Sequence, residues 1–188
     1  MCIRDSPDAK WSNGDPVTAE HFVYSYQRIL SKALASRYSY MLYPMKNAEE
    51  FHKEKISDFS QVGVKALDKF TLQIELNDPT PYLLDLMTHH AWYPVYPPAV
   101  EEHGGMTAQV NHWTRAENII GNGAFKMKEW KLNTYLDVER RDDYWDKENV
   151  NSTVCASSPS TTLSLNSGPT GVGQSTLPTS SLLIVLAG

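Results

Sequence analysis

Two adjacent histidines, His89 and His90, are the first residues of this sequence that suggest chemistry, because imidazoles are common metal ligands. Neighbouring side chains on a strand would face opposite sides, and a third ligand at a fitting spacing is missing from the sequence. His103 and His112 are isolated from the pair. A metal-dependent hydrolase that uses His89, His90 and a carboxylate stays open. Loop or solvent histidines explain the pattern more simply, so we expect no metal and no cofactor.

Pairs of adjacent acidic residues suggest a second chemistry, general acid–base catalysis, which needs two carboxyl groups in one cleft with shifted pKa values. Adjacent acids on a helix or loop more often form a solvated face. The pairs are Glu49-Glu50, Glu101-Glu102 and Asp142-Asp143. Gly104-Gly105 lacks the following Gly and Lys of a phosphate-binding loop, and no Gly-x-Ser-x-Gly nucleophile motif is present. The sequence therefore predicts that the chain is not an enzyme.

The overall composition is that of a globular protein with one domain or parts of two. The 188 residues include 41% hydrophobic and 21% charged side chains, and the formal net charge is -5. This mild acidity, without a stripe of Lys and Arg, predicts no nucleic-acid partner. No apolar run approaches the roughly 20 residues that a membrane-spanning helix needs.

The composition changes sharply near residue 150. All 17 Lys and Arg and all 22 Asp and Glu residues precede residue 151. Residues 151–188 are rich in Ser and Thr and cannot bury enough apolar surface to offset their chain entropy. We interpret them as a disordered or frame-shifted tail, with a natural linker as the alternative. Residues 1–6 resemble a translated sequencing adapter and lack the apolar stretch of a signal peptide. Both cysteines, Cys2 and Cys155, lie in these two pieces.

Helices and strands in residues 7–150 must position any functional side chain. Thr18 is expected to cap a helix that ends near Leu30, because apolar residues recur on one helical face and Glu20 lies in the first turn. Alternating apolar residues predict two antiparallel strands at residues 62–66 and 70–76.

Further elements are expected after residue 80. Pro81 and Pro98 each suit the first turn of a short helix, and these helices are expected to end near Met87 and Glu102. Two strands and a following loop are expected at residues 124–130, 135–140 and 141–145. Helices beside a mixed or antiparallel sheet correspond to an α/β or α+β fold.

Four stretches of the sequence follow one another in a recognisable order. The longest is residues 10–25, KWSNGDPVTAEHFVYS. The others are residues 62–68, residues 76–82, and residues 122–125 with 139–140 and 144–145. Together they resemble solute-binding protein family 5, the oligopeptide- and dipeptide-binding group of ABC importers. Four ordered stretches are more specific than any single motif, and the likeness is greatest to the oligopeptide-binding branch.

The resemblance implies a partial type II periplasmic-binding-protein-like fold. Residues 7–95 would form most of an accessory domain and residues 96–150 part of the first main lobe, with the second lobe outside this sequence. The resemblance also implies a periplasmic or cell-surface monomer, here without its signal peptide. It would bind extended oligopeptides and deliver them to the membrane permease of an ABC importer. The alternative for this sequence alone is a non-functional fragment without a complete cleft.

Two tyrosines are the ligand-binding candidates that the resemblance supplies. In the oligopeptide-binding branch a Tyr just after the first helix borders the cleft, and Tyr38 lies at the matching place. Tyr40 takes this role if the alignment slips by two residues. Family members hold a peptide largely through its backbone, and a Tyr hydroxyl can bond a peptide group while its ring packs on the ligand. A packing role for Tyr38 stays open, and the resemblance places the partners of the peptide termini mainly outside this sequence.

Overall fold

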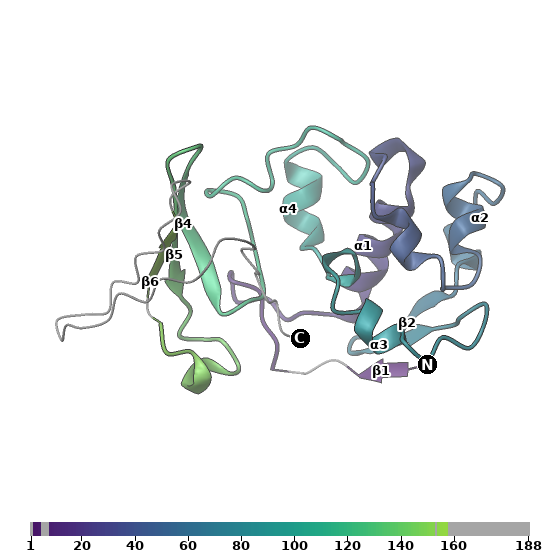
Figure 1. The fold of residues 1–188 in the computed structure, drawn as a ribbon, viewed down its shortest axis with the longest axis horizontal. Coiled ribbons are helices and arrows are strands. Elements are labelled where there is room, and N and C mark those ends of the chain that lie inside the picture. The colour runs from purple at the N-terminus through teal and green to yellow at the C-terminus, as the bar shows by residue number, and fades with distance from the viewer. Residues whose placement is uncertain (1, 5–7, 153, 158–188) are drawn as a thin grey trace. The chain divides into compact units, whose positions relative to one another are not determined.

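The structure, a computed structural model, describes residues 2–4, 8–152 and 154–157 (Figure 1). The chain divides into two compact units. Unit 1 consists of Pro16–Trp113 and the first strand, whereas unit 2 consists of Asp8–Asp15 and residues from Thr114 onward. The main part of unit 1, Pro16–Trp113, is therefore inserted in the sequence of unit 2. No helix in the described part of the chain is long and apolar enough to span a membrane.

Helix α1, Ala19–Leu30, is the longest helix of unit 1. Thr18 precedes it in an extended conformation, and its backbone N–H donates a hydrogen bond to His21 Nδ1 at 3.2 Å. Glu20 in the first turn and Arg28 in the last turn carry the charges that the helix dipole favours. The predicted helix is confirmed.

An antiparallel sheet with the strand order β1-β3-β2 lies against α1 (Figure 1). The strands are β1, Cys2–Arg4, β2, Val64–Asp68, and β3, Thr71–Ile74. Val64 pairs with Ile74 and Ala66 pairs with Leu72, which is the alternation expected from the sequence. The predicted pair of strands is therefore confirmed.

The core of unit 1 is apolar and centres on α1. Tyr26 of α1 meets Trp92 edge-on, with 5.5 Å between ring centroids, and its hydroxyl donates to the Trp92 carbonyl at 3.1 Å. The buried cluster consists of Ala19, Tyr26, Leu30, Leu42, Met45, Ala48, Val62, Val64, Leu72, Ile74, Leu83 and Trp92. Burial of this apolar area supplies the main stabilisation of unit 1.

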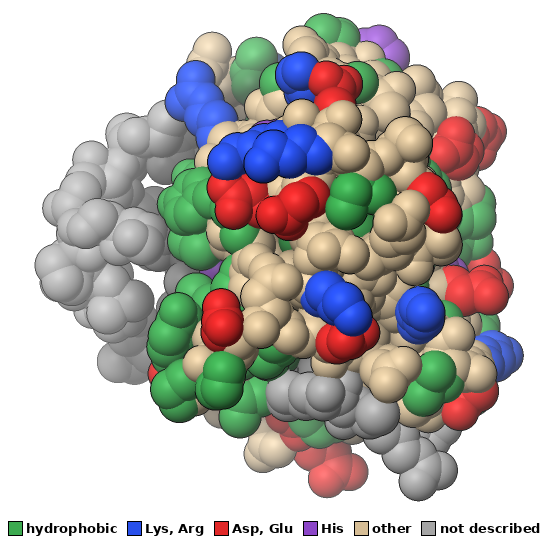
Figure 2. All heavy atoms as spheres, turned by 90° about the vertical axis from the view of Figure 1, so that its right-hand side faces the viewer, with side chains coloured by type: hydrophobic (Ala, Val, Ile, Leu, Met, Phe, Trp, Pro, Cys, Tyr) green, Lys and Arg blue, Asp and Glu red, His purple; other side chains and the backbone are tan. Residues whose placement is uncertain are grey.

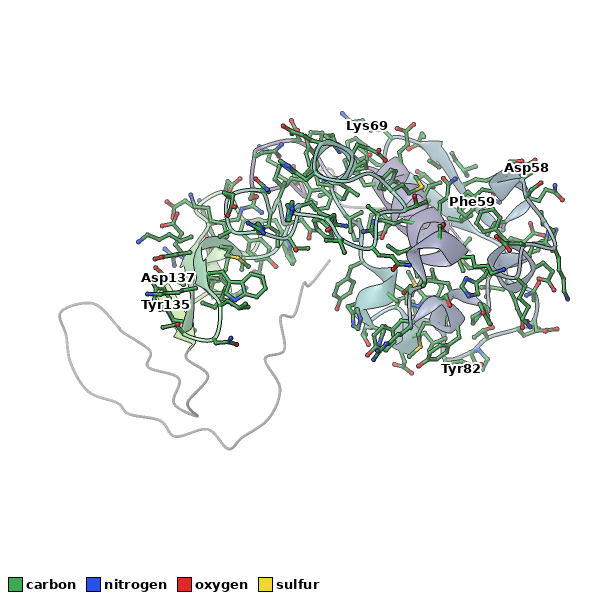
Figure 3. The ribbon with its side chains drawn as sticks, turned by 90° about the horizontal axis from the view of Figure 1, so that it is seen from above. Asp58, Phe59, Lys69, Tyr82, Tyr135 and Asp137 are labelled. Atoms are coloured by element: carbon green, nitrogen blue, oxygen red, sulfur yellow. The ribbon has the colours of Figure 1, made fainter. Side chains whose placement is uncertain are left out.

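Shorter helices complete unit 1. The α-helices are α2, Ala48–His52, α3, Leu83–Leu86, and α4, Pro97–Glu102. The 3-10 helices are η1, Lys32–Leu34, η2, Ser39–Leu42, η3, Phe59–Gln61, and η4, His90–Trp92. The predicted helices after Pro81 and at Pro98 correspond to α3 and α4 and are confirmed. Helix α2 was not predicted, because five residues contain too little of a helical period. Phe59, labelled in Figure 3, fixes η3 against α2 by packing edge-on to Phe51 at 5.1 Å between centroids.

Gly63 lies where three backbone segments of unit 1 approach closely. Its N–H donates to the Lys46 carbonyl at 2.8 Å, and its carbonyl accepts from the Glu75 N–H at 2.7 Å. A β-carbon at this position would lie 2.4 Å from the Glu75 carbonyl oxygen. Only glycine fits this close approach without displacing the backbone.

Unit 2 contains a second antiparallel sheet, with the strand order β4-β5-β6. Its elements are β4, Phe125–Lys131, β5, Tyr135–Arg140, the 3-10 helix η5, Lys147–Asn149, and β6, Val154–Ser157. Tyr135 and Asp137 lie on β5, as Figure 3 shows. The pairing of β4 with β5 confirms the two strands predicted for this region.

Arg141 organises the interior of unit 2. Its side chain is only 3% exposed, and its guanidinium donates to the carbonyls of Lys10, Trp11 and Gly123 at 3.1, 2.9 and 3.2 Å. Nε and Nη2 also donate to the Asp143 carboxylate at 3.0 and 2.9 Å. One cation therefore joins the segment that precedes the insertion to the segment that follows it.

Several sequence-based interpretations concern residues outside the described ones. Residues 1, 5 and 6 of the proposed adapter segment and most of the proposed tail, residues 151–188, are among them. Within these pieces, Cys2–Arg4 pairs with β3 and Val154–Ser157 pairs with β5. The origin of both pieces and the domain limits 7–95 and 96–150 stay predictions.

Candidate functional site

Tyr38 is brought together with the histidine pair, which is far from it in the sequence. It immediately precedes η2, and its side chain is 42% exposed. Its ring centroid lies 5.0 Å from that of His89 and 4.8 Å from that of His90, nearly perpendicular to the latter. Tyr38 thus presents an aromatic face and a hydroxyl at the surface, on a base of two imidazoles.

Tyr40 lies two residues further along and is more exposed, at 53%. Ser39, between the two tyrosines, is buried at 6% exposure. We call residues 38–40 the tyrosine turn. It offers two exposed rings with hydroxyl groups, a combination that suits a ligand with both apolar and hydrogen-bonding groups.

The histidine pair does not form a metal centre with other described residues. The two rings stack at 4.1 Å between centroids, and His89 Nδ1 accepts a hydrogen bond from the Ala91 backbone N–H at 3.2 Å. Burial lowers the pKa of His89, and the neighbouring His90 lowers it further. No group of three or more His, Cys, Asp or Glu side chains that could hold a metal ion occurs among the residues the structure describes. His89 therefore caps the N-terminus of η4, and the rings of His89 and His90 both pack against Tyr38.

Two of the acidic pairs are engaged in local contacts within unit 1. Glu49 forms an ion pair with Lys53 one turn later in the chain, and this contact lowers the pKa of Glu49. Glu101 on α4 accepts a hydrogen bond from the Tyr24 hydroxyl. Burial and Glu101 raise the pKa of Tyr24, so the phenol stays protonated. A general acid needs a carboxyl group with a raised pKa, and the shift at Glu49 has the opposite sign.

The third acidic pair borders a depression of about 390 Å³ in unit 2. Its lining is Ser12, Lys126, Glu139, Arg140, Arg141, Asp142 and Asp143. Arg141 lowers the pKa of Asp143, and Lys126, at 2.8 Å, lowers that of Glu139. These carboxylates are stabilised in the charged form by adjacent cations, which suits structural ion pairs rather than proton transfer.

His52 is a residue of this region that the sequence did not single out. Its Nδ1 lies 3.0 Å from the Leu30 carbonyl oxygen, and its Nε2 lies 3.2 Å from the Ser39 hydroxyl. It thus connects the end of α1 to the tyrosine turn. No sequence signal pointed to it, because helix α2, which carries it, was not predicted.

Charges of both signs are mixed on the surface of unit 1. Figure 2 shows Lys and Arg side chains beside Asp and Glu side chains over the face that it draws. The exposed ion pairs of unit 1 include Lys32 with Glu54 and Lys46 with Glu75. Such a face differs from the one-signed basic surface that nucleic-acid binding requires.

This fold is that of a bacterial solute-binding protein, as the comparison with known families shows. Residues 6–176 match the family described as bacterial extracellular solute-binding proteins, family 5, middle part, and the chain belongs to this family. The solved structures that it resembles are periplasmic-binding-protein folds, which confirms the predicted fold class.

Individual relatives narrow the likeness to oligopeptide-binding proteins. The chain is 41% identical over 141 residues to the periplasmic oligopeptide-binding protein OppA of Salmonella typhimurium, a match that covers 74% of this chain and 25% of the relative. Among solved structures, OppA of Burkholderia pseudomallei aligns with a TM-score of 0.76 and 31% identity, covering 84% of this chain and 30% of that one. Listeria monocytogenes OppA bound to peptide aligns with a TM-score of 0.73 and 35% identity, covering 81% and 29%. The chain thus spans about a quarter of the length of the curated relatives that it matches.

Proposed function

We propose that this chain is part of the substrate-binding component of an ABC importer that takes up oligopeptides. The observation that carries the proposal is the 41% identity to an oligopeptide-binding protein over 74% of the chain. The protein would act outside the cytoplasmic membrane as a monomer, with a peptide and the importer's permease as its partners. It binds and releases its ligand without catalysing a reaction.

The ligand side of the proposal rests on the tyrosine turn. Tyr38 is exposed, and its ring packs against the imidazole rings of His89 and His90. Because an ordered ring loses little entropy on binding, its hydroxyl can bond a peptide group at low cost. Tyr40 supplies a second exposed hydroxyl two residues away.

The mechanism that follows is closure of two lobes around a bound peptide. A peptide that contacts both lobes binds the closed form more tightly than the open form and shifts the population toward it. The present chain would contribute one wall of that site. The other wall would come from parts of the longer protein.

Peptide titration tests this function directly. The longest reading frame that contains this sequence is expressed, and a mixture of peptides of two to nine residues is titrated into it by calorimetry. We expect saturable heat with wild type and weaker binding with Tyr38→Ala. Tyr82→Ala, a change at another exposed tyrosine of unit 1, serves as the matched control and is expected to bind like wild type. Absence of peptide binding by the wild-type protein would contradict the proposed function.

A further inference from the structure

His52 lies where three elements of unit 1 meet. Helix α2 carries His52, α1 ends at Leu30, and η2 contains Ser39, and these three elements pack against one another. The Leu30 carbonyl belongs to the last turn of α1, where carbonyls have no donor from the helix itself. His52 Nδ1 reaches this carbonyl at 3.0 Å and so provides a donor.

The two hydrogen bonds determine the tautomer of the His52 ring. A carbonyl oxygen can only accept, so Nδ1 must carry the hydrogen that it shares with Leu30. In the neutral ring Nε2 is then the acceptor, and it receives the hydroxyl hydrogen of Ser39 across 3.2 Å. The Ser39 hydroxyl therefore donates to His52 Nε2, and His52 Nδ1–H donates to the Leu30 carbonyl.

Ser39 is the fixed point of the tyrosine turn. It is buried, whereas Tyr38 and Tyr40 on either side of it are exposed. The Ser39 hydroxyl is anchored through His52 to the carboxyl end of α1, which is itself part of the apolar core. Holding the middle residue restricts the backbone from which both tyrosine rings project.

We propose that His52 is a positioning residue for the tyrosine turn, acting through Ser39. It touches no ligand itself. The effect on peptide affinity rests on the function proposed above, whereas the effect on the conformation of the turn does not.

The first test is the state of the His52 ring in the 188-residue chain. Long-range ¹H–¹⁵N correlation spectra distinguish the two neutral tautomers, and we expect the Nδ1–H form. The ring resonances of Tyr38 and Tyr40 are then compared among His52→Phe, His52→Gln and Ser39→Ala. The Phe and Ala variants are expected to shift both tyrosines. The Gln variant, whose amide can donate to Leu30 and accept from Ser39, is expected to return them toward the wild-type positions.

Ser31→Ala is the matched control, because this serine also lies after α1 but its side chain makes no capping hydrogen bond. It is expected to leave the tyrosine resonances unchanged. An Nε2–H tautomer of His52, or unchanged tyrosine resonances in both His52→Phe and Ser39→Ala, would overturn the proposal.

Peptide affinity separates this inference from the function on which it depends. In the longer protein, His52→Phe is expected to weaken peptide binding about fivefold, the loss that one net hydrogen bond produces. His52→Gln is expected to restore most of that affinity. If Tyr38→Ala leaves affinity unchanged while His52→Phe still shifts the tyrosine resonances, the positioning role is upheld and the proposed peptide site fails.

Discussion

The two units of the chain are stabilised in different ways. Unit 1 has an apolar core in which Tyr26, Leu30 and Trp92 are fully buried around α1. In unit 2 the buried hub is the charged side chain of Arg141, which donates hydrogen bonds to backbone carbonyls from two segments. Apolar burial is nondirectional and insensitive to pH, whereas a charged hub depends on geometry and on its counter-ion. Mutations and pH should therefore affect the two units independently.

Truncating the core of unit 1 is expected to give the largest effect. Trp92→Ala removes a fully buried indole and should lower the free energy of unfolding of unit 1 by about 4 kcal/mol. Amide hydrogen exchange during a denaturant titration measures the free energy of unfolding of each unit separately. Leu84→Ala, at an exposed site in α3, is the control and should change stability by less than about 0.5 kcal/mol. Equal loss of protection in both units would show that they unfold together.

Removing the Arg141 guanidinium of unit 2 is expected to give the second-largest loss of stability. Arg141→Met leaves the carbonyls of Lys10, Trp11 and Gly123 without this donor and should cost about 3 kcal/mol, confined to unit 2. The measurement is loss of amide protection in unit 2 with unit 1 unchanged. Arg140→Met is the neighbouring control, because Arg140 is less buried, and a smaller loss is expected. Uniform loss in both units would refute the separation drawn here.

A substitution at Gly63 tests how tightly the backbone segments of unit 1 pack at this position. Gly63→Ala places a methyl group against the Glu75 carbonyl and should destabilise unit 1 by about 2 kcal/mol. Gly121→Ala is the matched control in unit 2, since a β-carbon there meets no atom within 4 Å. Thermal unfolding of both variants checks the prediction, and a Gly63→Ala variant as stable as Gly121→Ala would contradict it.

Low pH should destabilise unit 2 relative to unit 1, by less than the substitutions above. Arg141 lowers the pKa of Asp143 below its ordinary value of 3.8. A carboxyl group with a lowered pKa in the folded state contributes stability above its unfolded-state pKa and loses it as the pH falls through the folded-state value. Unit 2 should therefore lose protection as the pH drops below about 4, by a small amount because Asp143 is half exposed. Asp143→Asn should reduce this dependence and leave the part that Glu139, whose pKa Lys126 lowers, contributes. A wild-type pH profile retained in that variant would exclude Asp143 as a source.

Periodicity in the sequence was sufficient to predict α1, the β2–β3 pair and the β4–β5 hairpin, because each depends on the spacing of apolar residues along one segment. Periodicity does not predict the long-range polar contacts that form within each unit. Arg141 and Lys10 are 131 residues apart, and Leu30 meets His52 through a helix of only five residues. Tyr38 was singled out by resemblance, but its contact with His89 depends on tertiary packing that no local pattern encodes.

The insertion of unit 1 into unit 2 has a practical consequence. The two segments of unit 2 that flank residues 16–113 are hydrogen-bonded to each other, since the Ser12 N–H donates to the Gly121 carbonyl at 2.8 Å. A loop closed at its base in this way can be shortened or exchanged while the residues that close it are kept. We therefore expect that a short linker, or the corresponding residues of a relative, can replace residues 16–113.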